Sequence, residues 1–407
     1  MINLNRKSLF NISLKIVGTM FVFCVLAVSV TKFDFAAGAA VDRPDTNKDL
    51  VLAFVVHRHG ERTPAEEEAA LSPDLEVIKE IIELDGYEAL TNEGKRRAYQ
   101  IGKFLRQRYG SSQGYHLISK EYRYEELSLR TTAKDRTQMT AQIAMAALYS
   151  PEPVQQWDGG LGRIWQPIPY TTVPLSEDYL RYYSNCAWFK SLMKEAKERS
   201  LQEELAPYTD LIPLLKEKTG ANFTEDPLLF ETLFDLFRAQ IGLGLDLPEW
   251  AKPLLPRLTE AARLAYKLYF RNDDMKKIGG GVMLNHFMQA ADSIASGEKV
   301  NKRLRIFSSH DFNIGSLMEV TRVEGSNRSI PEYGALFALE LYRCKVTGQY
   351  YVLPVYLPSA GSSSAEFMKF SGCESSYCDL ETFRNQTSRF LLPENEFYQK
   401  CSIRTEL

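Results

Sequence analysis

The feature that most constrains the fold is an unbroken apolar run, Val51 to Val56, which leads directly into the segment HRHGERTP at residues 57–64. Continuous apolar runs of this length are typical of strands that are buried on both faces, as in parallel sheets covered by helices. The turn after the run contains two of the five histidines of the chain and two arginines. Because charged groups at a buried strand end are costly to desolvate, we expect an anion to bind there.

Segments with strand and helix patterns alternate along much of the chain. Further strands are expected at residues 122–129 and 305–308, and an antiparallel edge is expected at residues 337–342 and 350–356. Helices are expected at residues 91–109 and 137–148. This alternation predicts the α/β fold class, with a mainly parallel sheet flanked by helices.

A long helical region interrupts the alternation between residues 186 and 271. It contains leucine and phenylalanine clusters such as PLLFETLFDLFRAQIGLGL, which begins at Pro227. The region predicts a helical cap inserted into an α/β core that comprises residues 41–185 and 272–407. The three glycines at 279–281 lack the spacing of a phosphate-binding loop, so we expect them to mark the start of a helix.

The first 40 residues have the pattern of a cleaved secretory signal. Three basic residues precede the mostly apolar stretch 16–30, and small residues follow at positions 37–40. This stretch is shorter than a typical transmembrane helix, which needs about 20 apolar residues, and a retained signal anchor is the alternative. We therefore expect a secreted or lysosomal protein without a stable membrane span after signal cleavage.

Charge and cysteine content narrow the possible functions. Removal of residues 1–40 takes away four basic residues and one acidic residue, so the net charge changes from −3 to −6. This balance argues against a nucleic-acid-binding protein, which would have a basic surface. The removed segment includes Cys24, and the five remaining cysteines can form at most two disulfides and one free thiol.

Two local sequence patterns predict modifications. Cys373 and Cys378 are close enough in the sequence to form a local disulfide, and no cysteine or histidine spacing resembles a zinc site. Sequons for N-glycosylation begin at Asn222, Asn327 and Asn385.

Three predicted strand ends are followed by residues suited to phosphate chemistry. They are the turn from Arg58 to Arg62, Arg136, and the pair His310-Asp311. In an open α/β sheet, ligands bind beyond the carboxyl ends of the strands, so we expect these residues to meet at one edge. Arginines bind phosphate through paired hydrogen bonds, an imidazole can attack phosphorus, and an aspartic acid can protonate the leaving oxygen. The arginines supply the positive charge, so we expect no metal ion and no other cofactor.

Four segments resemble the histidine acid phosphatases. Arg58-His59-Gly60-Glu61-Arg62-Thr63-Pro64 resembles the family signature, Ser309-His310-Asp311 resembles its distal His-Asp pair, and LRTTAKDRTQMTA and VPLSEDYLRYYSNC resemble segments of the prostatic and lysosomal branch. The similarity covers essentially all of residues 49–401. It implies a sheet core of the phosphoglycerate-mutase type with a helical cap.

The resemblance also implies a role for each matching residue. The nucleophile would be His59, the proton donor Asp311, and the phosphate-binding residues Arg58, Arg62, Arg136 and His310. The disulfides would be Cys186–Cys401 and Cys373–Cys378, with Cys344 unmatched. Relatives in this branch are often homodimers, so a homodimer is a further expectation. The chain departs from the family pattern at Phe312-Asn313 and at Ala133, and the first departure lies next to the proton donor.

We therefore predict an acid phosphatase that hydrolyses small phosphate monoesters through a phosphohistidine. One alternative is a narrower phosphatase for lysophospholipids or inositol phosphates. Another, from a different class, is a secreted binding protein or allergen on a catalytically degenerate scaffold. Strand alternation places His57 on the same side as His59, and we expect it to be structural or a partner of the site rather than a reactant.

Overall fold

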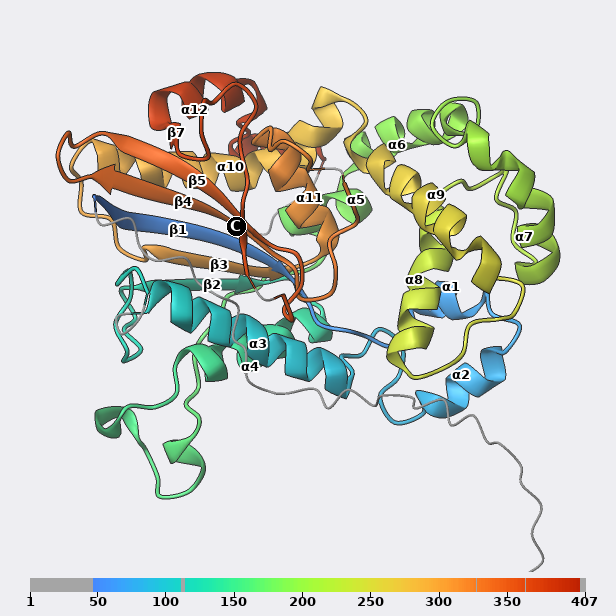
Figure 1. Ribbon diagram of the computed structural model, residues 1–407, viewed down its shortest axis with the longest axis horizontal. Coiled ribbons are helices and arrows are strands. Elements are labelled where there is room, and N and C mark those ends of the chain that lie inside the picture. The colour runs from blue at the N-terminus through green and yellow to red at the C-terminus, as the bar shows by residue number, and fades with distance from the viewer. Residues whose placement is uncertain (1–46, 111–113, 327, 363, 403–407) are drawn as a thin grey trace, which may run out of the picture. The chain divides into compact units, whose positions relative to one another are not determined.

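Strand β1 (Lys48–Arg58) lies in the interior of a seven-stranded sheet in the computed structural model. The strand order is β2-β3-β1-β4-β5-β6, with β7 paired to β5 (Figure 1). The structure describes residues 47–110, 114–326, 328–362 and 364–402. The predicted signal segment and the sequon at Asn327 lie outside these residues. The other strands are β2 (Leu127–Thr131), β3 (Leu304–Ser309), β4 (Leu336–Cys344), β5 (Tyr350–Leu357), β6 (Glu366–Phe367) and β7 (Cys378–Asp379).

Among the strands of the described residues, parallel ladders join β1 to β3 and β2 to β3. The ladders of β1 with β4, of β4 with β5, and of β5 with β6 and β7 are antiparallel. The predicted parallel sheet is therefore confirmed only for the part that carries β2, β3 and β1. β4 and β5 are joined by a short turn at residues 345–349, and strands with so short a connection pair antiparallel. The predicted antiparallel pairing of β4 with β5 is confirmed, but β4 lies between β1 and β5 rather than at an edge.

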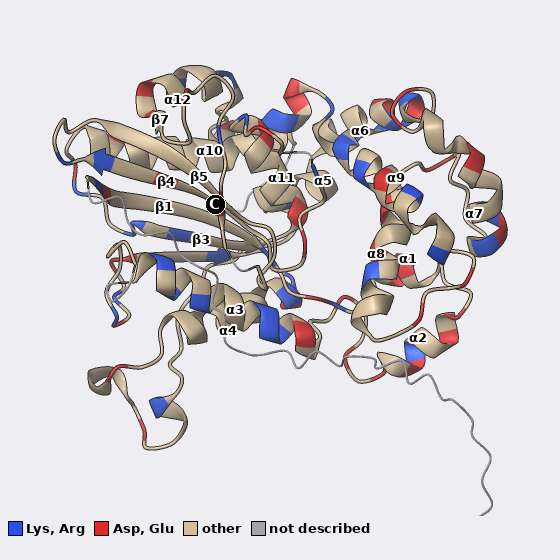
Figure 2. Cartoon of the chain, in the orientation of Figure 1, with Lys and Arg blue, Asp and Glu red and all other residues tan. Residues whose placement is uncertain are grey.

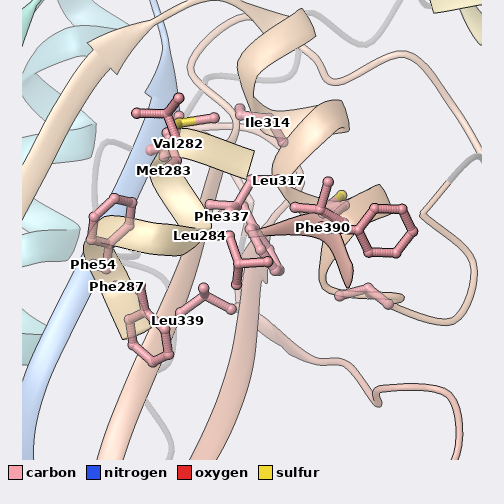
Figure 3. Packing of buried hydrophobic residues seen from close by; sticks show 14 of the residues in the cluster. Phe54, Val282, Met283, Leu284, Phe287, Ile314, Leu317, Phe337, Leu339 and Phe390 are labelled. Atoms are coloured by element: carbon pink, nitrogen blue, oxygen red, sulfur yellow. The ribbon is translucent and has the colours of Figure 1, made fainter. Parts of the chain in front are cut away.

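Helices cover both faces of β1 because its side chains alternate between two hydrophobic clusters. Phe54 and Val56 pack with α10 and α11 on one face (Figure 3). Val55 packs with α3 and α4 on the other face. These helices are α3 (Asn92–Tyr109), α4 (Asp135–Leu148), α10 (Asp273–Ala295) and α11 (Asp311–Val320). The fold class is therefore α/β, with a central sheet flanked by helices.

Some element boundaries differ from the predicted ones. β2 begins at Leu127 rather than at residue 122, because residues 123–126 form a hydrogen-bonded turn. α4 begins two residues earlier than predicted, after its N-cap Lys134, so Arg136 lies in the first turn of the helix. The predicted helix at 91–109 agrees with α3 to within one residue.

The glycines at 279–281 lie inside α10, which begins at Asp273, so the helix start expected at these glycines is wrong. A Cβ atom on Gly280 would collide with the carbonyl oxygen of Ser316 in α11. A Cβ atom on Gly281 would collide with the carbonyl oxygen of Phe390. The glycines therefore allow α10 to pack closely against its neighbours.

A group of helices beside the sheet contains most of the predicted cap (Figure 1). These helices are α6 (Ala187–Ser200), α7 (Ile212–Thr219), α8 (Leu229–Gly242) and α9 (Leu255–Lys267). α7, α8 and α9 share a hydrophobic cluster with residues of α1 (Glu66–Ala69) and α2 (Leu75–Ile81). The helical layer thus also draws on a segment outside residues 186–271, and the predicted domain boundaries stay a prediction.

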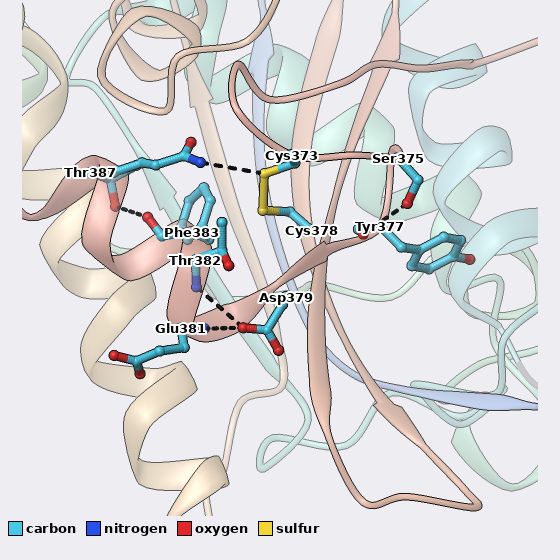
Figure 4. Close-up of a disulfide and its surroundings, with 10 residues drawn as sticks. Cys373, Ser375, Tyr377, Cys378, Asp379, Glu381, Thr382, Phe383 and Thr387 are labelled. Carbon is cyan, nitrogen blue, oxygen red and sulfur yellow. Dashed lines mark hydrogen bonds between the residues drawn. A yellow bond between two sulfur atoms is a disulfide. The ribbon is translucent and has the colours of Figure 1, made fainter.

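Two disulfides and one free cysteine are found among the described residues. Cys373–Cys378 closes the short loop that leads into β7 (Figure 4). Cys186–Cys401 joins the residue before α6 to the residue after the last helix, α13 (Glu394–Lys400). These are the two pairs that the resemblance implies, and Cys344 is the free thiol.

Charged side chains of both signs are spread over the helices and loops, whereas the strands are mostly uncharged (Figure 2). Of the predicted glycosylation sites, Asn385 is exposed and Asn222 is half-buried, and their glycosylation stays a prediction. In the part of the chain that the structure describes, no helix combines the length and the apolar character needed to cross a membrane.

Candidate active site

The carboxyl ends of the three parallel strands surround one cavity of about 210 Å³. Arg58, the last residue of β1, is paired in register with Ser309, the last residue of β3. α4 follows β2 and places Arg136 in its first turn. All six residues predicted for the site line this cavity: Arg58, His59, Arg62, Arg136, His310 and Asp311.

His59 makes a hydrogen bond at each ring nitrogen. Its Nδ1 lies 2.8 Å from the carbonyl oxygen of Gly60, and because a carbonyl can only accept, Nδ1 carries the proton. Nε2 accepts a hydrogen bond from Nε of Arg136 at 3.0 Å, so Nε2 is the unprotonated nitrogen. Burial, followed by the charges of Arg136 and His310, holds the pKa of His59 well below its ordinary value. The imidazole is therefore neutral in mildly acidic solution.

Gly60 is required next to His59 because the loop after β1 runs against the start of α3. A Cβ atom on Gly60 would collide with the carbonyl oxygen of Gly94, and one on Gly94 would collide with that of Glu61. α3 itself is fixed here by Thr91, whose hydroxyl accepts a hydrogen bond from the Gly94 amide at 3.1 Å. Two glycines in contact thus set the position of the loop that carries the site.

Arg58 is almost fully buried and joins β1 to Asp311. One Nη atom donates to the carbonyl oxygen of Pro331 at 2.7 Å, and the other lies 2.9 Å from Oδ2 of Asp311. The guanidinium also stacks 4.3 Å from the ring centroid of Tyr333. Its Nε has no hydrogen-bond partner among the described residues. The side chain is therefore held rigidly while one buried donor stays unused.

Carboxylates from outside the parallel strands hold the other two predicted arginines. Arg62 makes a paired interaction with Glu68 at 2.7 and 2.6 Å, and it lies 3.3 Å from Asp235. Arg136 lies 2.9 Å from Glu88. Burial alone would raise the pKa of Glu88, but Arg136 and a hydrogen bond from Lys134 lower it to about 2. These carboxylates keep the guanidiniums in place in the free site.

His310 and Asp311 stand at the N-terminus of α11. Nε2 of His310 lies 3.1 Å from the hydroxyl of Thr132 and 3.4 Å from Nη1 of Arg181. Burial and the charges of Arg136 and Arg181 hold the pKa of His310 well below its ordinary value. Oδ1 of Asp311 accepts a hydrogen bond from the Phe312 amide at 2.8 Å. The pair is thus positioned by the helix start on one side and by Arg58 on the other.

Several residues of the cavity were not predicted. Arg181, in the 3₁₀ turn Tyr179–Arg181, lies within the family-like segment VPLSEDYLRYYSNC but was given no role. Glu231 and Asp235 enter the cavity from α8. Their spacing of four places them on one face of a helix that is rich in leucine and phenylalanine, and this was the signal that could have identified them.

His57 lies behind the site. It is fully buried, does not line the cavity, and its Nδ1 is 3.3 Å from the carbonyl oxygen of Arg58. Burial lowers its pKa to about 4. Among the described residues, no cluster of three or more His, Cys, Asp and Glu side chains could hold a metal ion.

Comparison with known proteins identifies the family of the chain. The profile of the histidine phosphatase superfamily (branch 2) matches residues 49–356. The chain belongs to this superfamily. The curated relatives of this histidine phosphatase are acid phosphatases, so it is an enzyme of the phosphomonoesterase class.

The curated relatives align over most of their length. Venom acid phosphatase of Apis mellifera is 32% identical, with 86% of this chain and 87% of the relative covered. Prostatic acid phosphatase of Homo sapiens is 31% identical, with coverages of 84% and 86%. Lysosomal acid phosphatase of Homo sapiens is 25% identical, with coverages of 88% and 82%.

Solved structures of similar fold include bacterial phytases. The Klebsiella sp. ASR1 phytase has a TM-score of 0.59 at 17% identity and covers 86% of this chain and 100% of its own. The Hafnia alvei phytase in complex with myo-inositol hexakis sulphate has a TM-score of 0.58 at 15% identity, with coverages of 86% and 99%. At these identities the likeness concerns the fold alone.

Proposed function

We propose that this histidine phosphatase hydrolyses phosphate monoesters by transferring the phosphoryl group first to His59 and then to water. The observation that carries the proposal is a set of unused donors around the cavity. The Nε atoms of Arg58, Arg62 and Arg181 are buried and have no hydrogen-bond partner among the described residues. Buried donors in native proteins are nearly always paired, so these donors indicate a bound anion. The cavity places these arginine side chains around Nε2 of His59, where a phosphate group would accept their hydrogen bonds.

The residues support a reaction in two steps. Nε2 of His59 attacks phosphorus, the bond from phosphorus to the leaving oxygen breaks, and Asp311 protonates that oxygen. Water then attacks the phosphohistidine, Asp311 takes the proton of the water, and the nitrogen–phosphorus bond breaks. The arginines stabilise the charge on the equatorial oxygens during both steps. The lowered pKa of His59 keeps the nucleophile unprotonated in acid.

The test is to trap the intermediate. His59→Ala should abolish turnover of 4-nitrophenyl phosphate while the protein stays folded, because water cannot replace the positioned imidazole. Acid-labile phosphate should be recovered from wild-type protein quenched during turnover with a labelled substrate, and none from the variant. His116→Asn is the control, because His116 is exposed and asparagine tolerates its positive φ. Turnover of His59→Ala near the wild-type rate would exclude the phosphohistidine.

The alternative of a degenerate binding protein is disfavoured by the same side chains. A nucleophile, a proton donor and several arginines are all present around the cavity, and a scaffold that has lost catalysis commonly lacks at least one of these groups. The narrower alternatives, a phosphatase of lysophospholipids or of inositol phosphates, concern the leaving group and depend on the remaining walls of the cavity.

We also propose that the protein enters the secretory pathway and acts outside the cell or in the lysosome. The signal-like pattern of residues 1–40, the two disulfides and the sequons support this location. The homodimer expected from the resemblance stays a proposal, to be checked by light scattering of the secreted protein.

A further inference from the structure

Helix α8 presents two carboxyl groups to the cavity, and their surroundings differ. Asp235 lies 3.3 Å from Arg62 and 3.8 Å from Arg58, so its charge is balanced. Glu231, one helical turn earlier, is 8% exposed and lines the same cavity. Its side chain has no hydrogen bond and no ion pair among the described residues. The carboxyl oxygens are not among the fully buried unpaired atoms, so the carboxyl faces the cavity, where it is open to a ligand.

The groups around Glu231 come from several elements. The charged and titratable groups that act on it or feel its charge are Asp235 of α8, Asp311 of α11, Arg58 of β1, Glu68 of α1, Tyr266 of α9, Tyr269 of the 3₁₀ turn Leu268–Phe270, and Tyr182 of α5 (Tyr182–Asn185). Burial, followed by the charges of Asp235 and Asp311, raises the pKa of Glu231 well above its ordinary value. Arg58 opposes this effect but is already engaged by Asp311.

Aromatic rings form the wall beside the proposed proton donor. Phe312 follows Asp311 directly, and its ring centroid lies 4.2 Å from that of Tyr269 and 4.8 Å from that of Tyr183. All three rings line the cavity. Because Asp311 protonates the leaving oxygen in the proposed reaction, these rings lie where the leaving group must be.

The positive charge of the cavity is concentrated at the phosphate end. Arg62 and Arg136 are paired with Glu68 and Glu88, and Arg181 contacts His310. The guanidinium charges at this end are therefore suited to balance the charge of one phosphoryl group. Among the described lining residues, Arg181 forms no ion pair, and it lies against His310 and the ring of Tyr183. A second anionic group on the substrate that lies beside Phe312 and Tyr269 would instead meet Glu231.

We propose that Glu231 selects the leaving group, admitting neutral or cationic aromatic groups beside Phe312 and excluding leaving groups that carry a second anion. This inference rests on the proposed phosphatase function and specifies its substrate class. It argues against inositol polyphosphates, whose leaving group carries further phosphates. A cationic group over the ring of Phe312 would be favoured by the ring face and by the carboxylate together.

The selection should depend on pH. In acid, Glu231 is neutral and repels no anion. As the pH rises through its elevated pKa, the carboxylate forms next to the leaving group and anionic leaving groups are repelled. Discrimination against anionic leaving groups should therefore increase with pH, which is the sign expected for a carboxyl that loses a proton.

The experiment compares three aryl phosphates that differ only in the charge of the ring substituent. They are phenyl phosphate, 4-sulfophenyl phosphate and 4-(trimethylammonio)phenyl phosphate, whose substituents keep one charge at every pH used. For wild-type protein, the ratio of kcat/KM for phenyl to sulfophenyl phosphate should rise about tenfold or more between pH 4.5 and pH 7.5, as expected for an unscreened like-charge contact. Glu231→Gln should remove most of this rise.

Two variants separate the contributions. Glu217→Gln, an exposed carboxyl on cap helix α7, should behave as wild type. Phe312→Leu keeps an apolar side chain but loses the ring face, and it should lower the preference for the trimethylammonio substrate alone.

The outcomes distinguish this inference from the proposed function. If wild-type protein hydrolyses none of the three substrates, the phosphatase proposal fails. If it hydrolyses them with a charge preference that does not change between the two pH values, the role of Glu231 is overturned without use of any variant. A folded Glu231→Gln protein that keeps the wild-type pH dependence would overturn it as well.

Discussion

Asp311 is held by two neighbours, Arg58 at 2.9 Å and the Phe312 amide at 2.8 Å, while its carboxyl lines the cavity. Asparagine at this position keeps the size of the side chain but cannot supply a proton. We expect Asp311→Asn to lower kcat/KM for alkyl phosphates roughly a hundredfold or more, and far less for 4-nitrophenyl phosphate, because an activated phenolate leaves unprotonated. Steady-state kinetics on both substrates measures the difference.

Arg136→Ala provides the comparison for this prediction. Arg136 contacts the nucleophile rather than the leaving group. Its loss should therefore lower kcat/KM for both substrates by a similar factor and reduce inhibition by vanadate. An equal loss on both substrates in Asp311→Asn would show that Asp311 only holds Arg58 in place.

Six site residues could be predicted because each is adjacent in the sequence to a strand end or lies in a family-like segment. The carboxylates that hold the arginines could not be predicted from the sequence. Glu68 of α1 lies six residues after Arg62, whereas Asp235 of α8 lies 173 residues after it, and no sequence pattern shows which of the many acidic residues will contact the arginine. The spacing of Glu231 and Asp235 places both carboxyl groups on one face of α8, but this pattern does not show that the face lines the cavity.

At the scale of elements, the contact between the loop after β1 and the start of α3 positions His59. A Cβ atom on Gly94 would collide with the carbonyl oxygen of Glu61 and displace that loop. We expect Gly94→Ala to lower kcat roughly a hundredfold, the effect of moving catalytic groups by about 1 Å. The measurement is kcat on 4-nitrophenyl phosphate together with the free energy of unfolding in urea.

Gly281→Ala is the matched control, because its Cβ atom would also collide with a backbone carbonyl, that of Phe390, which does not line the cavity. It should lose a similar amount of stability, about 1–3 kcal/mol, and keep its kcat. If both variants lost kcat equally, the loss would reflect general destabilisation.

The strand β1 was predictable because a six-residue apolar run specifies burial on both faces. The direction of β4 was not, because buried strands have the same apolar pattern whether they pair parallel or antiparallel. The position of the glycines at 279–281 inside a helix could not be predicted either, because glycine can mark a turn or allow close packing. Only the contacts with Ser316 and Phe390 show that close packing applies here.

For the whole molecule, three buried histidines make stability depend on pH. The folded pKa values of His57, His59 and His310 are lowered by burial, to about 4 for His57. Below the unfolded pKa of about 6.5 the unfolded chain binds more protons, so the contribution of these histidines to stability is fully present above pH 7 and decreases as the pH falls toward 4. The contribution of Glu231 to stability has the opposite pH dependence, because its raised pKa favours the folded state in acid.

His57 allows this prediction to be tested away from the catalytic groups. His57→Phe keeps a buried ring but removes the titrating group. As the pH is lowered from 6 to 4.5, the free energy of unfolding should therefore decrease less steeply than in wild type, and the two slopes should differ by up to about 1.4 kcal/mol per pH unit. Urea unfolding at several pH values measures the slopes. Identical slopes would mean that His57 is not protonated on unfolding in this range.

The segment that we predict to be an inserted cap, residues 186–271, has aromatic residues near its two ends that lie close together. Tyr183, just before the segment, and Tyr269, near its end, have ring centroids 6.4 Å apart. A segment whose ends lie so close can be exchanged as a unit, provided that the exchange keeps the carboxylate of Asp235, which contacts Arg58 and Arg62. Grafting the corresponding segment of a relative into this chain, with aspartate kept at position 235, should replace Glu231 and with it the preference for the leaving group, while phosphoryl transfer by His59 is kept.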